Sequence, residues 1–198
     1  MAASERAKWM KRSKITDKQW NDGLGIYQGG DFEQINSALR GGRIAKGSLG
    51  DATGLIDDAF LNAPPLGKNQ IVYRTAYFDA ETAESVLGGV VPRSGVSFVD
   101  RGFMSTSLKK QVWEYGVADT QFTEGSIYNF RIRVPKSHKA IRMDEYMGES
   151  EILLNRNHQF RVVGKPRKMG TRELDLVVEG NERIGKVDVF EIELEIMP

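Results

Sequence analysis

The sequence predicts an α+β fold in which a layer of helices comes first and a mostly antiparallel β-sandwich follows. Apolar residues recur at helical spacing in the first third of the chain, whereas from residue 70 onward apolar and polar residues tend to alternate. Because the strands follow one another without a helix after each, a parallel α/β sheet is not expected. A chain of 198 residues, 40% of them hydrophobic, can form one compact domain with a buried core. We expect residues 1–66 to form the helical layer and residues 67–198 the β-core.

Three helices are predicted between residues 17 and 62, each with apolar residues on one face. Thr16 and Asp17 can cap the first and Asp31 the second, while Pro64-Pro65 ends the third. The apolar faces consist of Trp20 and Leu24; Phe32, Ile35 and Leu39; and Leu55, Ile56, Ala59 and Phe60.

From Gln70 onward the pattern changes to strands, interrupted by a short helix over residues 81–87. In residues 128–134 every second residue is apolar, which predicts a half-buried strand. Near the C-terminus this phase slips at Val189-Phe190, which predicts a β-bulge there. We assign the last acidic residues to a solvated strand face; they are Glu191, Glu193 and Glu195. The predicted β segments are residues 71–77, 96–107, 128–134, 151–154, 160–163, 174–178 and 187–196.

The charge balance argues against a nucleic-acid-binding protein. The chain has 28 Lys and Arg and 27 Asp and Glu, a formal net charge of +1. It contains no long apolar run and no signal-peptide pattern, so we expect neither membrane insertion nor Sec-type export. It has no cysteine, which excludes disulfides and cysteine nucleophiles. Only His138 and His158 could contribute imidazole ligands, and we expect them to be structural, with no metal site.

An arginine interrupts the first predicted strand at Tyr73-Arg74-Thr75, where most neighbours are apolar. One interpretation is an edge-strand arginine that points to solvent, as most arginines do. The other is a guanidinium held by the sheet, whose planar fork can bind a phosphate or carboxylate with two hydrogen bonds.

Three consecutive hydroxyl residues follow an aromatic residue in the second segment, Gly102-Phe103-Met104-Ser105-Thr106-Ser107. Runs of Ser and Thr often only cap or turn the chain. On a strand, however, Ser105 and Ser107 would face one side and Thr106 the other. One pair of hydroxyls could then position a carboxylate or a ribose.

Two glutamates at a spacing of two, Glu149 and Glu151, form the third segment, which begins at Tyr146. On a strand their carboxylates would project to the same side and repel each other, which costs stability unless basic groups or a substrate compensate. The pair follows a glycine and precedes the apolar strand of residues 152–154, which favours a site at the mouth of that strand.

In this order, the three segments resemble the motifs of mono-ADP-ribosyltransferases similar to clostridial binary toxins and vegetative insecticidal proteins. The resemblance covers roughly residues 70–196, and residues 148–154 look like that family's Gly-Glu-x-Glu-[apolar]-Leu-Leu. The predicted N-terminal helices also resemble the family's helical layer. The resemblance implies the ADP-ribosyltransferase fold and an enzyme that cleaves NAD, its co-substrate, and transfers ADP-ribose to a protein side chain without a metal.

The resemblance also implies how NAD is bound. Arg74 would contact the NAD phosphates, with Tyr73 beside it, while Thr106 and Ser107 would support the strand and the nicotinamide pocket. Some relatives carry a further arginine after Ser-Thr-Ser, but residues 103–129 here contain none. The second phosphate contact could come from Lys109, from a residue such as Arg40 or Arg43, or from backbone amides at a helix start.

For catalysis, the resemblance implies that Ser105 orients Glu151. Glu151 would hydrogen-bond the 2′-OH of the nicotinamide ribose and stabilise the oxocarbenium-like charge that develops as nicotinamide leaves. Glu149 would engage the incoming nucleophile, and a glutamate at that position goes with arginine acceptors. A carboxylate can orient a guanidinium and take its proton, which a neutral amide cannot do. Tyr146 would recognise the target protein, although it could equally be plain packing.

Three alternatives stay open. The first is an NAD glycohydrolase, which passes ADP-ribose to water. The second is a transferase of the same fold with another acceptor, either a different protein side chain or a nucleic acid, which the near-neutral charge disfavours. The third is a catalytically inactive binding module of the same fold. The resemblance further implies a bacterial or phage toxin or effector that is secreted or injected and acts in the cytosol of a host or competitor cell. Its expected partners are a target protein and, where the producer needs them, an immunity protein and a delivery partner.

Overall fold

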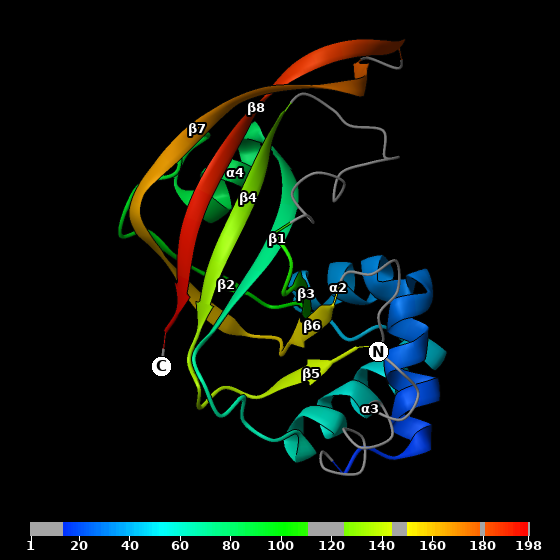
Figure 1. Ribbon diagram of the computed structural model, residues 1–198. Helices are drawn as coiled ribbons and strands as arrows, with labels where there is room; N and C mark the ends of the chain where they lie inside the picture. The colour runs from blue at the N-terminus through cyan, green and yellow to red at the C-terminus, as the bar shows by residue number, and fades with distance from the viewer. Residues whose placement is uncertain (1–13, 111–124, 144–149, 179–180, 198) are drawn as a thin grey trace. The chain divides into compact units, whose positions relative to one another are not determined.

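The computed structural model describes residues 14–110, 125–143, 150–178 and 181–197, which form an α+β fold (Figure 1). The predicted fold class is confirmed: helices come first and a mostly antiparallel sheet follows. The chain divides into two compact units, each made of three segments. The first unit comprises Met1–Gln70, Asp100–Thr106 and Pro135–His158, and the second comprises Ile71–Val99, Ser107–Val134 and Gln159–Pro198.

Helices dominate the first unit. They are the π-helices η1 (Gln19–Leu24) and η2 (Tyr27–Asp31) and the α-helices α2 (Phe32–Arg40) and α3 (Ser48–Asn62). Thr16 and Gln19 form a capping box at the first helical turn, in which each side chain bonds the backbone N–H of the other. The prediction that Thr16 caps this helix is therefore confirmed. Asp31 precedes α2, but its side chain makes no capping hydrogen bond, so that part of the prediction is wrong.

Three short strand segments complete the first unit: the start of β3 (Met104–Ser107), β5 (Ala140–Arg142) and β6 (Glu151–Leu154). Strand β6 lies between β3 and β5 and pairs antiparallel with β5. The helices and strands share one core, in which Phe60 stacks on Phe103 at 6.0 Å between ring centroids. Trp20 is buried in this core, in agreement with its predicted packing role.

The second unit is a strongly curved sheet with one helix. Its elements are β1 (Gln70–Asp79), α4 (Ala80–Leu87), β2 (Ser97–Asp100), β4 (Gly125–Val134), β7 (His158–Val178) and β8 (Asn181–Ile196). The strand order is β2-β7-β8-β4-β1, and β1 also pairs with Ser107, the last residue of β3. Strands β7 and β8 form the long antiparallel ribbon that arches over this unit in Figure 1. Strand β4 runs parallel to β8.

One prediction about these strands is wrong, and two are confirmed only in part. The segments predicted at 160–163 and 174–178 belong to one strand, β7. The irregularity predicted at Val189-Phe190 is confirmed in place, because the register shifts there between Lys168 and Gly170, but the extra residue is on β7 and not on β8. A second shift lies between Val163 and Arg167, opposite Glu193 and Glu191. The half-buried pattern predicted for residues 128–134 is confirmed from Phe130 onward, where the apolar residues are buried and Arg131 and Arg133 are partly or fully exposed. It fails at the start of β4, where residues 126–129 are all buried. There, Thr75 donates a hydrogen bond to Asn129 at 3.0 Å, so a polar residue occupies a buried position with its bonding satisfied.

The prediction that Glu191 lies on a solvated strand face is also wrong, because its side chain is buried and the residue is only 8% exposed. Its carboxylate pairs with Arg167 at 2.6 Å across the β7–β8 ladder. Glu193 and Glu195 are half-buried and pair with arginines of neighbouring strands. Arginine pairing thus replaces much of the predicted solvation.

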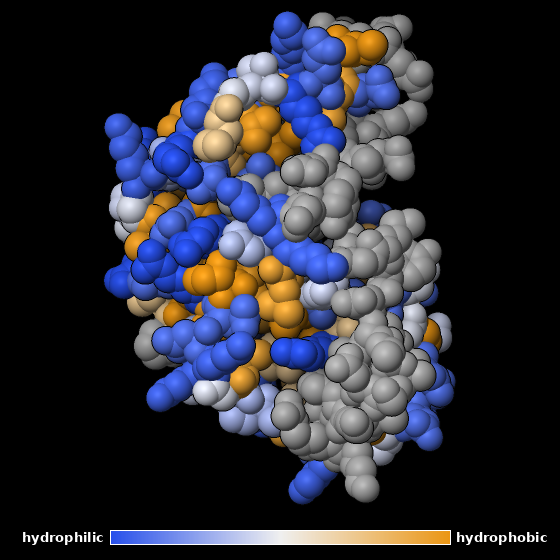
Figure 2. Space-filling view, in the orientation of Figure 1, coloured by the Kyte–Doolittle hydropathy of each residue, from blue (hydrophilic) through white to orange (hydrophobic). Residues whose placement is uncertain are grey.

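Polar and charged side chains cover much of the molecular face in Figure 2, and apolar side chains gather in patches between them. No helix in the described part of the chain has the length and apolar character needed to cross a membrane.

Candidate functional site

The predicted hydroxyl and acidic motifs meet where β3 lies beside β6. Ser105 Oγ donates a hydrogen bond to Glu151 Oε1 at 2.5 Å. Thr106, which points the other way as strand alternation requires, donates from Oγ1 to the carbonyl oxygen of Ile152 at 2.6 Å. Thr106 is buried, whereas Ser105 and Glu151 are only partly covered. The Thr106 bond therefore ties the strands together behind the site, and the Ser105 bond holds a carboxylate that remains accessible.

A residue from the helical layer reaches the other oxygen of the same carboxylate. Gln28 Nε2, in η2, donates to Glu151 Oε2 at 3.2 Å. Each oxygen of Glu151 thus receives a hydrogen bond from a different element. Charge-assisted bonds of this kind fix the orientation of a carboxylate.

The helical layer is attached to β3 through the backbone of Phe103. Asn36 Oδ1 accepts from Phe103 N at 2.8 Å, and Tyr27 donates from its hydroxyl to Phe103 O at 3.2 Å. Asn36 Nδ2 also donates to the Tyr27 hydroxyl at 2.9 Å. Gly102 permits this close approach, because a Cβ there would lie 2.7 Å from Asn36 Oδ1. All three bonds are buried, so they fix the backbone two residues before Ser105.

The second unit holds the remaining predicted NAD-binding residues that the structure describes. Tyr73 of β1 lies opposite Ser107 in the antiparallel pairing of β1 with β3. Ser107 is buried, and its hydroxyl accepts a hydrogen bond from Lys109 N at 2.9 Å. Arg74 follows Tyr73 on β1 and is partly exposed, and its contact with the NAD phosphates stays a prediction.

Arg40, one candidate for the second phosphate contact, is committed elsewhere. Its guanidinium makes a two-pronged ion pair with Asp100, with both N–O distances at 2.9 Å. The same aspartate accepts from the backbone of Gly102. Arg40 therefore stabilises the turn before β3, whereas Arg43 and Lys109 are exposed and remain candidates.

Glu149 and Tyr146 lie outside the described residues. The roles proposed for them therefore stay predictions from the sequence.

The two histidines form a contact pair in the first unit, with ring centroids 5.2 Å apart. Burial, followed by the charge of His138, lowers the pKa of His158 to about 4, although Asp100 acts in the opposite direction. Burial also lowers the pKa of His138. Both imidazoles are therefore neutral near pH 7. Among the described residues, no group of three or more His, Asp or Glu side chains could hold a metal ion.

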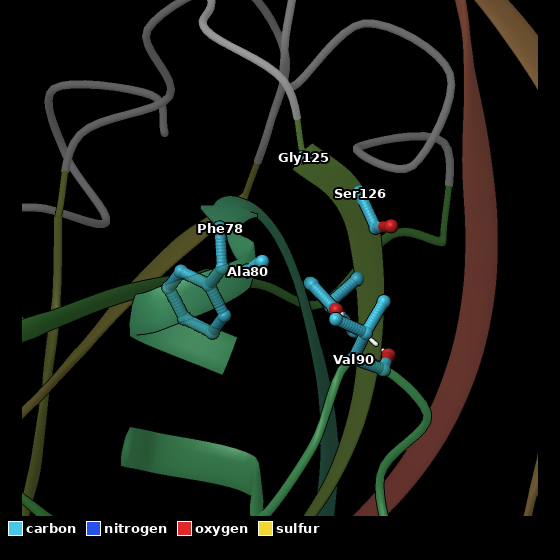
Figure 3. A pocket seen from close by; sticks show the side chains of 6 residues that line it. Phe78, Ala80, Val90, Gly125 and Ser126 are labelled. Carbon is cyan, nitrogen blue, oxygen red and sulfur yellow. Dashed lines mark hydrogen bonds between the residues drawn. The ribbon is translucent and has the colours of Figure 1, made fainter. Parts of the chain in front are cut away.

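A cavity of about 200 Å³ in the second unit contains none of the predicted site residues (Figure 3). Its lining is mainly apolar, and its Tyr128 hydroxyl donates to Val90 O at 2.9 Å. The lining residues are Phe78, Ala80, Val90, Gly125, Ser126 and Tyr128. These described lining residues include no carboxylate and no cation, so they offer no group for NAD cleavage.

Gln28, Tyr27 and Asn36 were not predicted from the sequence as residues of the site. The sequence contains one signal for Gln28: it directly precedes Gly29-Gly30, a pair of glycines at which a helix is expected to end. A contact across 123 positions of the chain has no local pattern, so only the fold reveals it.

Comparison with models of protein families matches residues 3–189 to the ADP-ribosyltransferase exoenzyme family. A search of curated proteins found no match. Among solved structures, the enzymatic component C2-I of the C2 toxin from Clostridium botulinum is 21% identical, with a TM-score of 0.62 over 96% of this chain. This chain spans 46% of C2-I.

Two further structures are matched along most of their length. Plx2a, an ADP-ribosyltransferase toxin from Paenibacillus larvae, is 20% identical, with a TM-score of 0.62 over 98% of this chain and 92% of that one. The Clostridium limosum C3 exoenzyme is 16% identical, with a TM-score of 0.63 and the same two coverages. These structures share the fold with this chain.

Proposed function

Because the chain belongs to the ADP-ribosyltransferase exoenzyme family, we propose that it cleaves NAD and transfers ADP-ribose to an arginine of a target protein. The observation that carries this proposal is the Glu151 carboxylate, which Ser105 and Gln28 hold from two sides. A carboxylate in a fixed orientation is the group that a developing positive charge on a ribose requires.

The reaction breaks the bond between C1′ of the ribose and the nicotinamide nitrogen. Nicotinamide leaves with the bonding electrons, and positive charge develops on the ribose. Glu151 accepts a hydrogen bond from the ribose 2′-OH and stabilises this charge. Arg74 holds the NAD phosphates through its planar fork. Tyr73, Thr106 and Ser107 complete the NAD-binding strands in this proposal.

The acceptor is a guanidinium nitrogen, which attacks C1′ as the oxocarbenium-like charge develops. Glu149 attracts the guanidinium and takes the proton that the nitrogen loses, so that the products are nicotinamide, ADP-ribosyl-arginine and a proton. Support for arginine comes from the glutamate at position 149, because an amide could not take this proton. Tyr146 contacts the target protein in this proposal.

We place the activity in the cytosol of a host or competitor cell, as a secreted or injected toxin or effector. Support comes from relatives whose names describe toxins, namely the C2 toxin and Plx2a. A structure of exoenzyme S from Pseudomonas aeruginosa, 18% identical, contains human 14-3-3 protein beta and carba-NAD. A host protein as target or activator, and an immunity or delivery partner, are the partners that fit this role.

The test supplies the purified chain with NAD and agmatine, a small guanidine, and measures free nicotinamide, free ADP-ribose and the guanidine adduct. The wild type should produce the adduct, and Glu151→Gln should lose all NAD cleavage. Glu149→Gln should keep cleavage but lose transfer. If free ADP-ribose forms but no adduct does, both in the presence of agmatine and in the presence of cell extract, the chain is a glycohydrolase. No NAD cleavage in either setting would establish a binding module.

A further inference from the structure

Gln28 reaches Glu151 of the acidic motif from the helix η2, not from a strand of the sheet. It follows Tyr27 in the short π-helix η2, and Gly30, with φ of 121°, ends that helix two residues later. Only glycine adopts such a backbone conformation without strain, so the chain can turn into α2 here. Gln28 is therefore the last side chain before the kink.

The backbone around Gln28 is anchored on both sides of this kink. Tyr27 is bonded to the carbonyl oxygen of Phe103, and Asn36 of α2 is bonded to the N–H of Phe103 and to the Tyr27 hydroxyl. Tyr27 is also packed edge-on against the Phe103 ring, with centroids 5.9 Å apart. Since Phe103 precedes Ser105 by two residues on the same chain segment, the backbone of this one residue links the segment of Gln28 to that of Ser105.

These contacts close a ring through the first unit. It runs from Tyr27 to Phe103, along the chain to Ser105, across to Glu151 and back to Gln28. Each contact in the ring lies within the first unit. An ionised carboxylate only accepts hydrogen bonds, so Gln28 faces it with its amide nitrogen and adds no charge.

We propose that Gln28 is a positioning residue for Glu151, whose amide fixes the second oxygen of the carboxylate while Ser105 fixes the first. This inference rests on the proposed function. One donor alone leaves a carboxylate free to rotate about its terminal torsion, which is soft. Two donors from different elements fix that torsion.

Gln28→Leu tests the proposal, because leucine keeps the bulk of the side chain and removes the donor. We expect kcat for NAD cleavage to fall about tenfold, the equivalent of one hydrogen bond to a charged group. The KM for NAD should stay within about threefold, since the mechanism gives Gln28 no contact with NAD. Gln34→Leu is the matched control, because it makes the same change at an exposed position of α2 and should leave kcat unchanged.

A second variant separates positioning from packing through the pH dependence. Gln28→Glu keeps the length but places a second carboxylate against Glu151, so the acid limb of the kcat profile should move to higher pH. Gln28→Lys retains a donor and should move that limb to lower pH, with more activity than Gln28→Leu. A residue that acted only through packing would not move the limb in opposite directions.

The outcomes distinguish this inference from the proposed function. Two results with an active wild type overturn the positioning role and leave the proposed function standing. In the first, Gln28→Leu has the kcat of the wild type. In the second, the acid limbs of the kcat–pH profiles of Gln28→Glu and Gln28→Lys lie at the same pH. An inactive wild type overturns the proposed function and this role together. Loss of activity in Gln34→Leu as well would assign the effect to the helix and also overturn the role.

Discussion

Ser105 Oγ lies 2.5 Å from Glu151 Oε1, so the hydroxyl motif and the acidic motif meet in a direct hydrogen bond. The residues are 46 positions apart in the chain and are brought together by the adjacency of β3 and β6. A short hydroxyl–carboxylate bond is among the stronger hydrogen bonds in proteins because the acceptor is charged.

Removal of this bond should affect catalysis more than folding. For Ser105→Ala we expect kcat for NAD cleavage to fall about 10- to 100-fold, since the carboxylate loses its stronger donor. Ser137→Ala, at an exposed turn, is the control and should match the wild type. Nicotinamide release measures both. A Ser105→Ala enzyme with unchanged kcat would show that the observed bond does not serve the reaction.

Thr106 should show the reverse pattern, because its bond to Ile152 O is buried and faces away from Glu151. Thr106→Val keeps the shape and removes the donor, which should lower the free energy of unfolding by about 1–2 kcal/mol. Urea denaturation measures the loss. At a temperature where the variant is folded, its kcat should stay within about threefold of the wild type. Equal stability of Thr106→Val and wild type would contradict this interpretation.

Asn36 joins η2, α2 and β3 through the backbone of Phe103. Asn36→Leu leaves the buried Phe103 N–H without its partner and should lower the free energy of unfolding by about 2–3 kcal/mol. Tyr27→Phe loses only a hydroxyl and should cost about 1 kcal/mol. Denaturant unfolding compares the two variants. An Asn36→Leu protein no less stable than Tyr27→Phe would mean that this network contributes little.

The histidine pair predicts acid sensitivity of the folded state. In the unfolded chain His158 titrates near its ordinary pKa, whereas in the folded chain its pKa is about 4, so the unfolded chain binds more protons between these values. Stability is therefore full above about pH 6.5 and falls as the pH drops toward 4, by up to about 3 kcal/mol.

The groups that act on His158 include His138, which disfavours its charge, and Asp100, which favours it and is itself paired with Arg40. His158→Phe keeps an aromatic ring and removes the titration. Its free energy of unfolding should be much less dependent on pH between 6.5 and 5 than that of the wild type. If both proteins show the same slope in that range, the pair is not the source of the acid sensitivity.

Much of this fold could be predicted from the sequence because its elements have strong local patterns. The capping box at Thr16 and the proline pair after residue 62 mark helix ends in the sequence itself. Strand β7 could not be delimited, since residues 164–173 are rich in charge and glycine and look like a loop. The antiparallel pairing with β8 stabilises them as a strand.

The candidate site was predictable to a similar extent. Ser105, Thr106 and Glu151 belong to short motifs whose chemistry is recognisable, and the structure brings them together. Gln28 and the burial of Glu191 depend on partners in distant segments, which single-sequence patterns do not encode. Both errors concern polar side chains whose solvation is replaced by hydrogen bonds or ion pairs from another strand or helix.

The central claim is transfer of ADP-ribose to a protein arginine, and mass spectrometry of a target-cell lysate tests it most directly. The lysate is incubated with labelled NAD and either the wild-type chain or Glu151→Ala. We predict a labelled protein with the adduct on an arginine, present with the wild type and lost with the variant. Labelled free ADP-ribose with no labelled protein, or equal labelling by both proteins, would contradict the claim.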